Sequence, residues 1–324
     1  MLEKEQIISI VEQVKPNVKA KSRNVYVSNI MRVMKKYEDT YKKDISSINF
    51  LDDINKIKSI LPEKISTKKN YLMSLLILLH SDDKYKELYD KYLKYANEII
   101  KLNDEYRNSQ EKSESQKRNW IEWEKIEELL QELKTEVYHY KIPRQETLNK
   151  KNKQILQDYV LLALYVYQAP RRAVYADMKI ITEAEYKGLT NDEKRQNNWL
   201  VVNKKNRKKY FILTKFKTEK SQGLSRIEIS KKMSRVLNLL LRFLNTGDWL
   251  LTNKQGNKMS ANILTKHLVR IFKPTGKRIS INMLRHLYAT KHSPAKNVNL
   301  EKLKEEADKM GHSVEQHIKY IKKD

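Results

Sequence analysis

Two stretches near the end of the chain decide the fold: ISINMLRHLYATKH at residues 279–292 and KMGHSVEQHIKY at residues 309–320. In the first stretch Ile281, Leu284 and Tyr288 recur at the three- and four-residue spacing of a helix, which places one apolar face inward. Three polar residues share the opposite face, namely Asn282, Arg285 and His286. Because this helix is anchored by apolar residues, its polar trio either meets water or lines a site.

The second stretch predicts a helix that ends at a glycine. Apolar residues spaced for a helix occupy residues 300–310, and Gly311 is a residue type that stops helices. His312 is then placed by the helix end rather than by its own packing. If the last segment continues as a helix, Tyr320 lies about 200° around it from the apolar Ile318. We therefore expect the Tyr320 hydroxyl to point away from the packing side.

Composition points to a polyanionic partner. The 324 residues carry a net charge of +26 and no cysteine. Self-repulsion of this size is relieved by nucleic acid, which we favour over an anionic membrane surface. An AT-rich genome, which inflates lysine, is an alternative cause of the charge. The N-terminus lacks the cleavage site of a signal peptide and no apolar run is long enough to cross a membrane, so an intracellular protein that is not secreted is expected.

The chain is long enough for two domains. Residues 1–102 follow helical periodicity throughout. Residues 103–118 are polar and almost free of aliphatic side chains, as a linker would be. The second domain is then expected at residues 119–324. It begins with helical patterns, including an apolar helix at residues 153–168 that is expected to be buried on all sides.

The buried helix leads into Ala169-Pro170-Arg171-Arg172, where the proline ends it. Two arginines this close to a core must reach a surface or be paired. One interpretation is a structural ion pair with Asp177 or Glu183, and the other is a binding site.

The period changes after residue 198. The runs WLVVN, YFILTKFKT and SRIEIS alternate with turn residues and predict a three-stranded antiparallel sheet, before helices resume at residues 231–244 and 261–272. The fold class is thus mainly α with a small antiparallel β-sheet. The basic residues of the first hairpin suit a nucleic-acid backbone: Lys204, Lys205, Arg207, Lys208, Lys209 and Lys215. A nuclear import signal is an alternative reading of residues 204–209.

Five features in this order resemble the tyrosine recombinase (integrase) superfamily, whose catalytic domain is phage-integrase-like. They are Arg171, a lysine in a β-hairpin, the Arg-His pair of LRHLYAT, the Met-Gly-His triplet and a final tyrosine, spread over residues 120–320. The APRR and NMLRH stretches are similar to the branch found in eukaryotic DNA viruses, virophages and Crypton-type elements. The helical first domain resembles the family's core-binding domain, which clamps the other side of the duplex.

The resemblance implies a role for each matching residue. Arg171 matches the first catalytic arginine, with Arg172 as the alternate. Lys217 matches the lysine of the hairpin, and Lys220 is its alternate. In the family the arginines grip the scissile phosphate and the lysine protonates the leaving 5′ oxygen.

The remaining roles fall on the two terminal stretches. Arg285 matches the second arginine, His312 the second histidine, and Tyr320 the nucleophile. Asn282 occupies the position that a first histidine usually holds. His286, next to the arginine, is more simply a structural histidine and is an alternate site residue.

The implied activity cleaves and rejoins DNA through a 3′-phosphotyrosyl intermediate, with neither metal nor ATP, so no cofactor is expected. Implied partners are double-stranded DNA and further copies of the chain, as dimer or tetramer, with no membrane. Such an enzyme integrates or excises a mobile or viral element, in the host nucleus or at a cytoplasmic viral replication site. Two alternatives are a type IB topoisomerase-like enzyme, which shares the catalytic set, and a catalytically inactive DNA-binding relative.

Four departures from the family's pattern stand out. Val174 lies three residues after Arg171, where an acid is usual, so Asp177 is the nearest substitute partner. Asn282 cannot carry a proton. Tyr320 follows His312 by eight residues rather than nine. Few residues follow Tyr320, whereas many relatives exchange a C-terminal helix between protomers.

Overall fold

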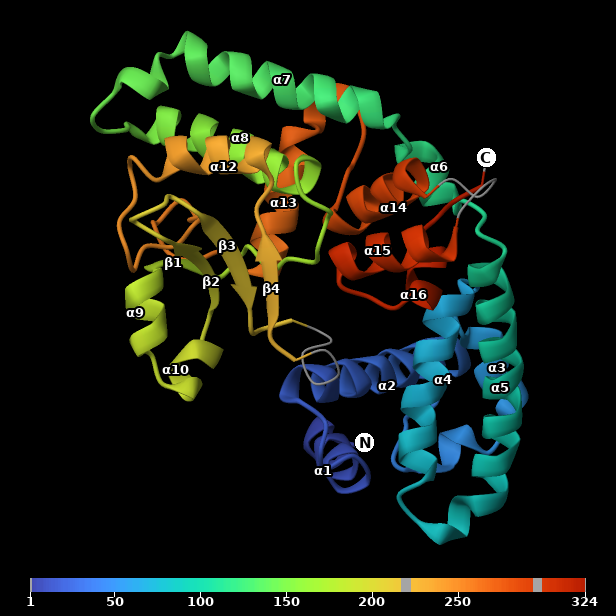
Figure 1. Cartoon of the computed structure of the whole chain (residues 1–324). Coiled ribbons are helices and arrows are strands. Elements are labelled where there is room, and N and C mark those ends of the chain that lie inside the picture. Colours follow the sequence, from blue (N-terminus) through green and yellow to red (C-terminus); the bar gives the residue numbers. More distant parts are fainter. Residues whose placement is uncertain (1, 217–222, 294–298, 324) are drawn as a thin grey trace. The chain divides into compact units, whose positions relative to one another are not determined.

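A computed structural model describes residues 2–216, 223–293 and 299–323. The chain divides into two compact units, Met1–Ser109 and Gln110–Asp324 (Figure 1). The division falls within the segment 103–118, but this segment is more helical than a linker. The long helix α5 (Lys86–Asn108) extends into it, and α6 (Glu114–Asn119) begins within it. Among the described residues no helix is long and apolar enough to cross a membrane.

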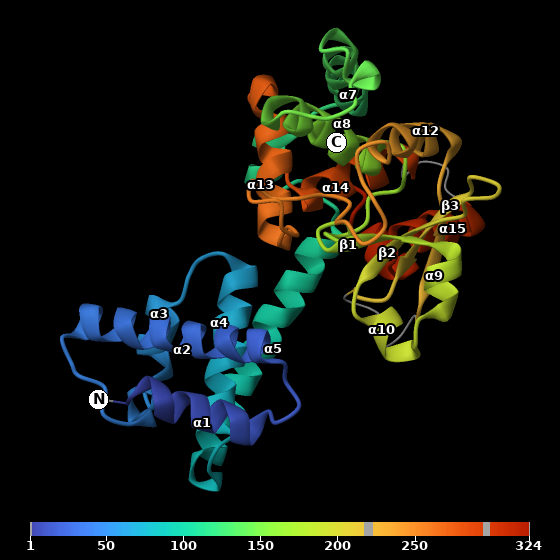
Figure 2. The same ribbon diagram turned by 90° about the vertical axis from the view of Figure 1, so that its left-hand side faces the viewer.

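The first unit is built from helices. Its elements are α1 (Lys4–Val14), α2 (Ala20–Tyr41), η1 (Ile48–Leu51), α3 (Ile54–Ile60), α4 (Ile65–Leu79), η2 (Asp83–Tyr85) and α5. Helix α2 packs on α4, which packs along α5 (Figure 2). Helix α2 buries Ile30, Val33 and Tyr37, as their spacing predicts. The buried Tyr92 of α5 donates its hydroxyl to the carbonyl of Leu51 at 2.9 Å, which satisfies the polar end of its ring.

Helices also dominate the second unit. They are α6, α7 (Trp123–His139), η3 (Ile142–Arg144), α8 (Lys150–Val166), α9 (Glu183–Gly188), α10 (Asn191–Arg195), α12 (Lys231–Leu240), α13 (Ala261–Ile271), η4 (Lys273–Thr275), α14 (Ile281–His292), α15 (Leu300–Met310) and α16 (Val314–Ile318). Helices α7, α12 and α13 all pack on α8, which makes α8 the centre of the unit.

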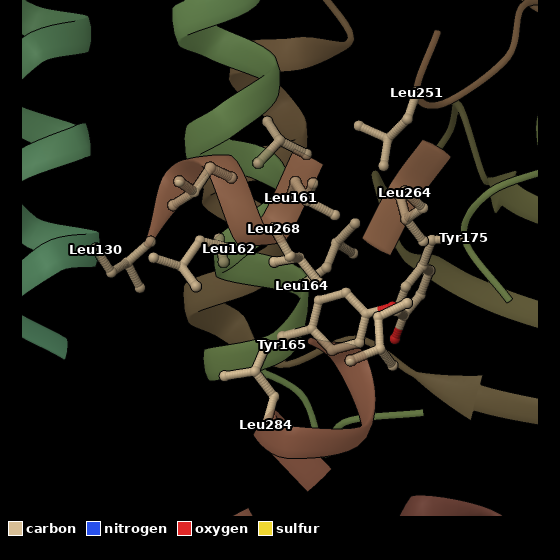
Figure 3. Packing of buried hydrophobic residues seen from close by; sticks show 14 of the residues in the cluster. Leu130, Leu161, Leu162, Leu164, Tyr165, Tyr175, Leu251, Leu264, Leu268 and Leu284 are labelled. Atoms are coloured by element: carbon tan, nitrogen blue, oxygen red, sulfur yellow. The ribbon is translucent and has the colours of Figure 1, made fainter. Parts of the chain in front are cut away.

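The core around α8 confirms the prediction of a helix buried on all sides. Every residue from Ile155 to Tyr165 is buried. Figure 3 shows Leu161, Leu162 and Leu164 of α8 packed among side chains from α7, α13 and α14. The loop that carries the two arginines leaves this core directly, so its first residues start from a rigid support.

The sheet has four strands in the order β1-β2-β3-β4: β1 (Met178–Thr182), β2 (Asn198–Val202), β3 (Lys209–Leu213) and β4 (Ser225–Glu228). Strands β2, β3 and β4 are antiparallel, as their sequence predicts. Strand β1 was not predicted and pairs parallel to β2, so the sheet is mixed. A parallel neighbour needs a crossover, which α9 and α10 supply here.

Side chains alternate between the two faces of the sheet. Leu200 and Phe211 face the main core around α8, whereas Trp199, Val201 and Ile212 form a smaller cluster on the other side with Tyr186 of α9. Both faces are therefore covered, which fixes the register of β2 and β3.

Candidate active site

Arg285 lies on α14, whose first turn is capped by the hydroxyl of Ser280. The side chain is only 1% exposed. Its Nη1 donates to the carbonyls of Pro170 at 2.7 Å and Met310 at 3.2 Å. Nη2 donates to Nδ1 of His312 at 2.9 Å, while Nε has no partner within the described part of the chain. Burial lowers the pKa of the guanidinium, and the ring of Tyr320 opposes this shift.

Arg171 is held by the carboxyl end of α15. Its Nε donates to the carbonyl of Lys309 and its Nη2 to that of Asp308, both at 2.9 Å. The last carbonyls of a helix lack partners within the helix and carry its partial negative charge, so they suit a cation. These contacts leave Nη1 of Arg171 without a hydrogen-bond partner among the described residues.

The end of α15 replaces the acid that the sequence lacks near Arg171. Val174, at the position where an acid was sought, is buried in the apolar core. Glu183 pairs with Lys187 and bonds to Asn203, so it is not a partner of either arginine. Within the described ranges, Asp177 makes no ion pair with them either, which rules out the predicted structural pair. Backbone carbonyls therefore orient Arg171. Among the described residues no carboxylate forms an ion pair with it, although the Asp308 carboxylate acts on it electrostatically.

Arg172 lies beside Arg171 in a different environment. Its side chain is half-buried and makes no hydrogen bond within the described residues. The guanidinium is close enough to lower the pKa values of both Arg285 and His312, although burial is the larger cause for each. Three cations thus converge where the loop after α8 meets α14 and α15.

Tyr320 lies in this cationic site, but not as its helical phasing predicted. Helix α16 ends at Ile318, so the tyrosine is in the turn that follows. Ile318 is 39% exposed, and Tyr320 is only 6% exposed. The expectation of an exposed tyrosine on a polar helix face is therefore wrong, because the segment is rotated and the helix is shorter than assumed.

The buried ring of Tyr320 contacts three candidate site residues. Its centroid lies 4.6 Å from that of His286 and 5.1 Å from that of His312, with the Arg285 guanidinium at 4.7 Å. Its hydroxyl donates to Oδ1 of Asn282 at 3.1 Å. All three residues of the predicted trio on α14 therefore contact the tyrosine, and Asn282 is exposed to water as well.

Burial disfavours the charged form of both histidines that flank Tyr320. His286 Nδ1 lies 2.9 Å from the backbone carbonyl of Tyr320, which accepts only, so this nitrogen carries the proton. Burial lowers the pKa of His286 to about 4. Burial, with Arg285 next in effect, lowers the pKa of His312 to about 2. His312 follows Gly311, which ends α15 in the left-handed conformation as predicted, with φ of 68°.

The residues after Tyr320 pack against the start of the second unit. The backbone N–H of Lys322 donates to Thr290 Oγ1 at 2.9 Å, and that of Lys323 donates to the carbonyl of Gln110 at 3.1 Å. The side chain of Gln110 in turn donates to the carbonyl of Ile318 at 2.9 Å. Tyr320 is thus held from both sides along the backbone.

Solved structures with this arrangement of elements identify the fold. The whole chain (100%) aligns with 82% of the XerH site-specific recombinase bound to difH substrate in a pre-cleavage complex, with a TM-score of 0.53 and 15% identity. The XerH post-cleavage complex on palindromic difH gives a TM-score of 0.50 at 15% identity, over 99% of this chain and 81% of that one. The chain has the fold of a tyrosine recombinase.

The resemblance drawn from the motifs is thereby confirmed at the level of the fold, as is the mainly helical class with a small sheet. XerA recombinase is a further match, with a TM-score of 0.40 and 12% identity over 98% of this chain and 94% of that one. No protein-family model matches the sequence, and no curated protein matches it either.

Lys217, which the sequence resemblance matches to the lysine of the hairpin, and its alternate Lys220 both lie outside the described residues. The strand that leads to them is anchored by the buried Asn198. Its amide oxygen accepts from the N–H groups of Thr214 and Lys215, at 3.0 and 2.9 Å. Its amide nitrogen donates to the carbonyl of Val174 at 3.0 Å, in the loop of the arginines. The exposed Lys215 therefore lies at the end of β3 nearest the site.

The other basic residues of the hairpin lie at the opposite end of β3. The turn between β2 and β3 exposes four of them: Lys204, Lys205, Arg207 and Lys208. Lys209 differs because its side chain is largely buried and its Nζ donates to the Arg207 carbonyl at 3.0 Å and to Ser234 Oγ at 3.3 Å. Of these residues, only the exposed ones can reach a nucleic-acid backbone.

Sequence reasoning missed three residues that contact the candidate site residues or the hairpin. His317 and Ser293 stand behind His312, and Asn198 anchors the hairpin. The only sequence signal for His317 was its position, five residues after the histidine of the Gly-His pair. Among the described residues no cluster of three or more His, Asp or Glu could hold a metal ion.

Proposed function

We propose that the chain is a site-specific DNA recombinase or integrase that cleaves and rejoins strands through a 3′-phosphotyrosyl intermediate. One observation carries the proposal: Arg171 and Arg285 are buried, hydrogen-bond to no carboxylate in the described chain, and lie close enough to repel each other, with Arg285 against the ring of Tyr320. Burying cations without a counter-charge costs several kcal/mol, on the order expected from ion desolvation. A phosphodiester supplies the missing charge and accepts from both guanidiniums.

The proposed reaction is an in-line displacement at phosphorus. The Tyr320 oxygen attacks, a bond from phosphorus to tyrosine forms, and the bond to the 5′ oxygen breaks. The leaving oxygen takes a proton from Lys217, the role that the resemblance assigns to it. The guanidiniums stabilise the charge on the non-bridging oxygens. Attack by the 5′ hydroxyl of another strand reverses these steps and rejoins the DNA. The phosphotyrosine ester retains the energy of the diester, so no ATP is needed.

Asn282 orients the nucleophile in this scheme. Its amide oxygen accepts the hydroxyl of Tyr320, but an amide cannot take up the proton. The phenol proton therefore passes to a phosphate oxygen or to water as the bond to phosphorus forms. His286 contributes by holding the backbone carbonyl of Tyr320.

The partners follow from the same scheme. Double-stranded DNA binds the second unit at the exposed basic residues of the hairpin, and the helical first unit acts as the core-binding clamp on the duplex. Recombination joins two duplexes, so copies of the chain assemble as a dimer or tetramer in a synaptic complex. The reaction integrates or excises a mobile or viral element, in the host nucleus or at a cytoplasmic viral replication site.

Covalent trapping tests the proposal. The full chain is incubated with a pool of nicked suicide duplexes from the DNA that flanks its gene, and adducts are resolved on a denaturing gel. We expect an adduct that is absent with Tyr320→Phe. An adduct that survives this substitution would contradict the nucleophile. DNA binding without any adduct would favour the inactive relative, and site-independent relaxation of supercoiled plasmid would favour the topoisomerase.

A further inference from the structure

A buried row of side chains stands behind the Arg285 guanidinium. Arg285 Nη2 lies 2.9 Å from His312 Nδ1, and His312 Nε2 lies 3.0 Å from His317 Nδ1. His317 Nε2 lies 3.0 Å from the hydroxyl oxygen of Ser293, the residue that ends α14. His317 is 0% exposed, and Ser293 and His312 are buried as well. We refer to Ser293, His317 and His312 as the buried triplet.

The direction of each hydrogen bond in the triplet follows from the arginine. A guanidinium only donates, so Nδ1 of His312 accepts and carries no proton. The neutral His312 ring then carries its proton on Nε2 and donates it to Nδ1 of His317. By the same reasoning His317 carries its proton on Nε2 and donates to Ser293. One tautomer of each ring satisfies all three contacts.

Both ring nitrogens of His312 are therefore engaged inside the protein. No donor remains on this ring for a phosphate, so His312 cannot donate a hydrogen bond to it directly. The bond that His312 makes toward the site is the one it accepts from Arg285. Its effect on a bound phosphate must then pass through the orientation of that guanidinium.

We propose that His317 and Ser293 are positioning residues that hold His312 as a hydrogen-bond acceptor, so that His312 acts on the scissile phosphate through Arg285. This inference rests on the proposed function, because it assigns roles in that reaction. Partners behind a functional histidine fix its tautomer and ring orientation, and their loss costs about 10- to 100-fold in comparable sites. His317 is the central member because it contacts both other residues of the triplet.

His317 also supports the nucleophile through its backbone. Its carbonyl accepts the N–H of Tyr320 at 2.8 Å. Substitution of the His317 side chain leaves this backbone bond in place. Side-chain variants therefore report the loss of the triplet's hydrogen bonds alone. Glu306, which acts electrostatically on His317, already accepts from the Tyr288 hydroxyl at 3.0 Å and from Lys309 at 2.9 Å. Within the part of the chain that the structure describes, the hydrogen-bonded row therefore ends at Ser293 rather than at an acid.

Two substitutions separate positioning from packing. In His317→Gln the amide keeps one acceptor for His312 and one donor for Ser293, whereas His317→Leu keeps neither. We expect single-turnover cleavage by His317→Leu to fall about 10- to 100-fold with DNA affinity unchanged, and His317→Gln to restore most of the rate. Equal loss in both variants, with folding intact by circular dichroism, would overturn the proposal.

A double-mutant cycle tests the route through Arg285. If the triplet acts through this arginine, His317→Leu should have little further effect in an Arg285→Lys background. The matched control combines His317→Leu with Arg172→Lys, where the effects should multiply. Multiplication of the effects in the Arg285→Lys background would mean that the triplet acts on the phosphate by another route.

The tautomers provide a test that needs no catalysis. The full chain labelled with ¹⁵N-histidine is measured by long-range ¹H–¹⁵N correlation, with the signals assigned from single substitutions. We expect His312 and His317 to be neutral with the proton on Nε2. A proton on Nδ1 of His312 would overturn the positioning proposal even if the adduct forms. Failure to form any adduct would instead refute the proposed function, while the tautomers still decide the structure of the triplet.

Discussion

The guanidinium of Arg171 lies directly against Gly311: a Cβ atom at position 311 would come within 2.7 Å of Arg171 Nη1. The same glycine adopts a left-handed φ of 68°, which L side chains rarely adopt. Gly311 therefore ends α15 and also leaves room for the arginine that the α15 carbonyls hold.

This relationship predicts the effect of Gly311→Ala. The added methyl group displaces Arg171, and a displacement of about 1 Å in an active site can cost about 100-fold in rate. We expect the single-turnover cleavage rate to fall by about 100-fold while the affinity for DNA stays unchanged. Gly276→Ala is the matched control, because Gly276 has the same φ of 68° but a Cβ atom there would meet nothing within 4 Å. Equal rates for the two variants would show that contact with Arg171 is unimportant.

The two neighbouring arginines are expected to differ in function. The guanidinium of Arg171 donates two hydrogen bonds to two carbonyls at once, which the single ammonium group of lysine cannot reproduce. Arg171→Lys should therefore lower the cleavage rate by about 100- to 1000-fold. Arg172 makes no such bonds among the described residues, and Arg172→Lys keeps the positive charge. The cleavage rate of this variant should therefore fall by less than about tenfold. Single-turnover cleavage of one duplex by both variants measures the difference. The opposite order would make Arg172 the catalytic arginine.

The lowered pKa of His286 predicts a pH-dependent stability. An unfolded histidine titrates near about 6.5, whereas burial lowers the pKa of His286 to about 4. As the pH falls below about 6.5, the unfolded chain takes up a proton that the folded chain does not. The contribution of His286 to the free energy of unfolding is therefore fully present above about pH 6.5. Below this pH the contribution should decrease by at most about 1.4 kcal/mol per pH unit.

The four tryptophans all belong to the second unit, at residues 120, 123, 199 and 249, so their fluorescence reports its unfolding alone. Urea titrations between pH 7.5 and 4.5 should show a smaller slope with pH for His286→Gln than for the unchanged chain. Identical slopes would indicate that folding does not lower the pKa of His286.

The exposed basic turn between β2 and β3 predicts a salt-dependent affinity. Each phosphate contact contributes about 0.9 to the slope of log affinity against log salt. Alanine at the four exposed positions should therefore lower this slope by up to about 3.6, if all four meet phosphates. Replacement of the three lysines by arginine keeps the charge and should keep the slope. An unchanged slope in the alanine variant would remove this turn from the interface.

Local sequence patterns predicted much of the fold because apolar spacing and glycine reflect packing directly. Helix α8 is buried as its composition requires, and α15 ends at Gly311. Strand β1 was missed because a run of five residues, MKIIT, carries no period that distinguishes a strand from a helix. Its parallel partner β2 is distant in sequence, so the pairing is a tertiary property.

The sequence predicted which residues form the candidate site better than it predicted how they are arranged. The trio on α14 could be identified because it shares one helix face. The burial of Tyr320 could not, because α16 ends early and the tyrosine lies in a turn whose direction depends on tertiary contacts. The partners of Arg171 are backbone carbonyls, which any residue type supplies, so the sequence contains no signal for them.

Covalent attachment of Tyr320 to DNA is tested most directly on the adduct itself. After trapping on a nicked duplex, the adduct is trimmed with nuclease, digested with protease and mapped by mass spectrometry. We expect a nucleotide linked through its 3′ phosphate to the peptide that contains Tyr320. A nucleotide on any other residue, or attachment through a 5′ phosphate, would contradict it.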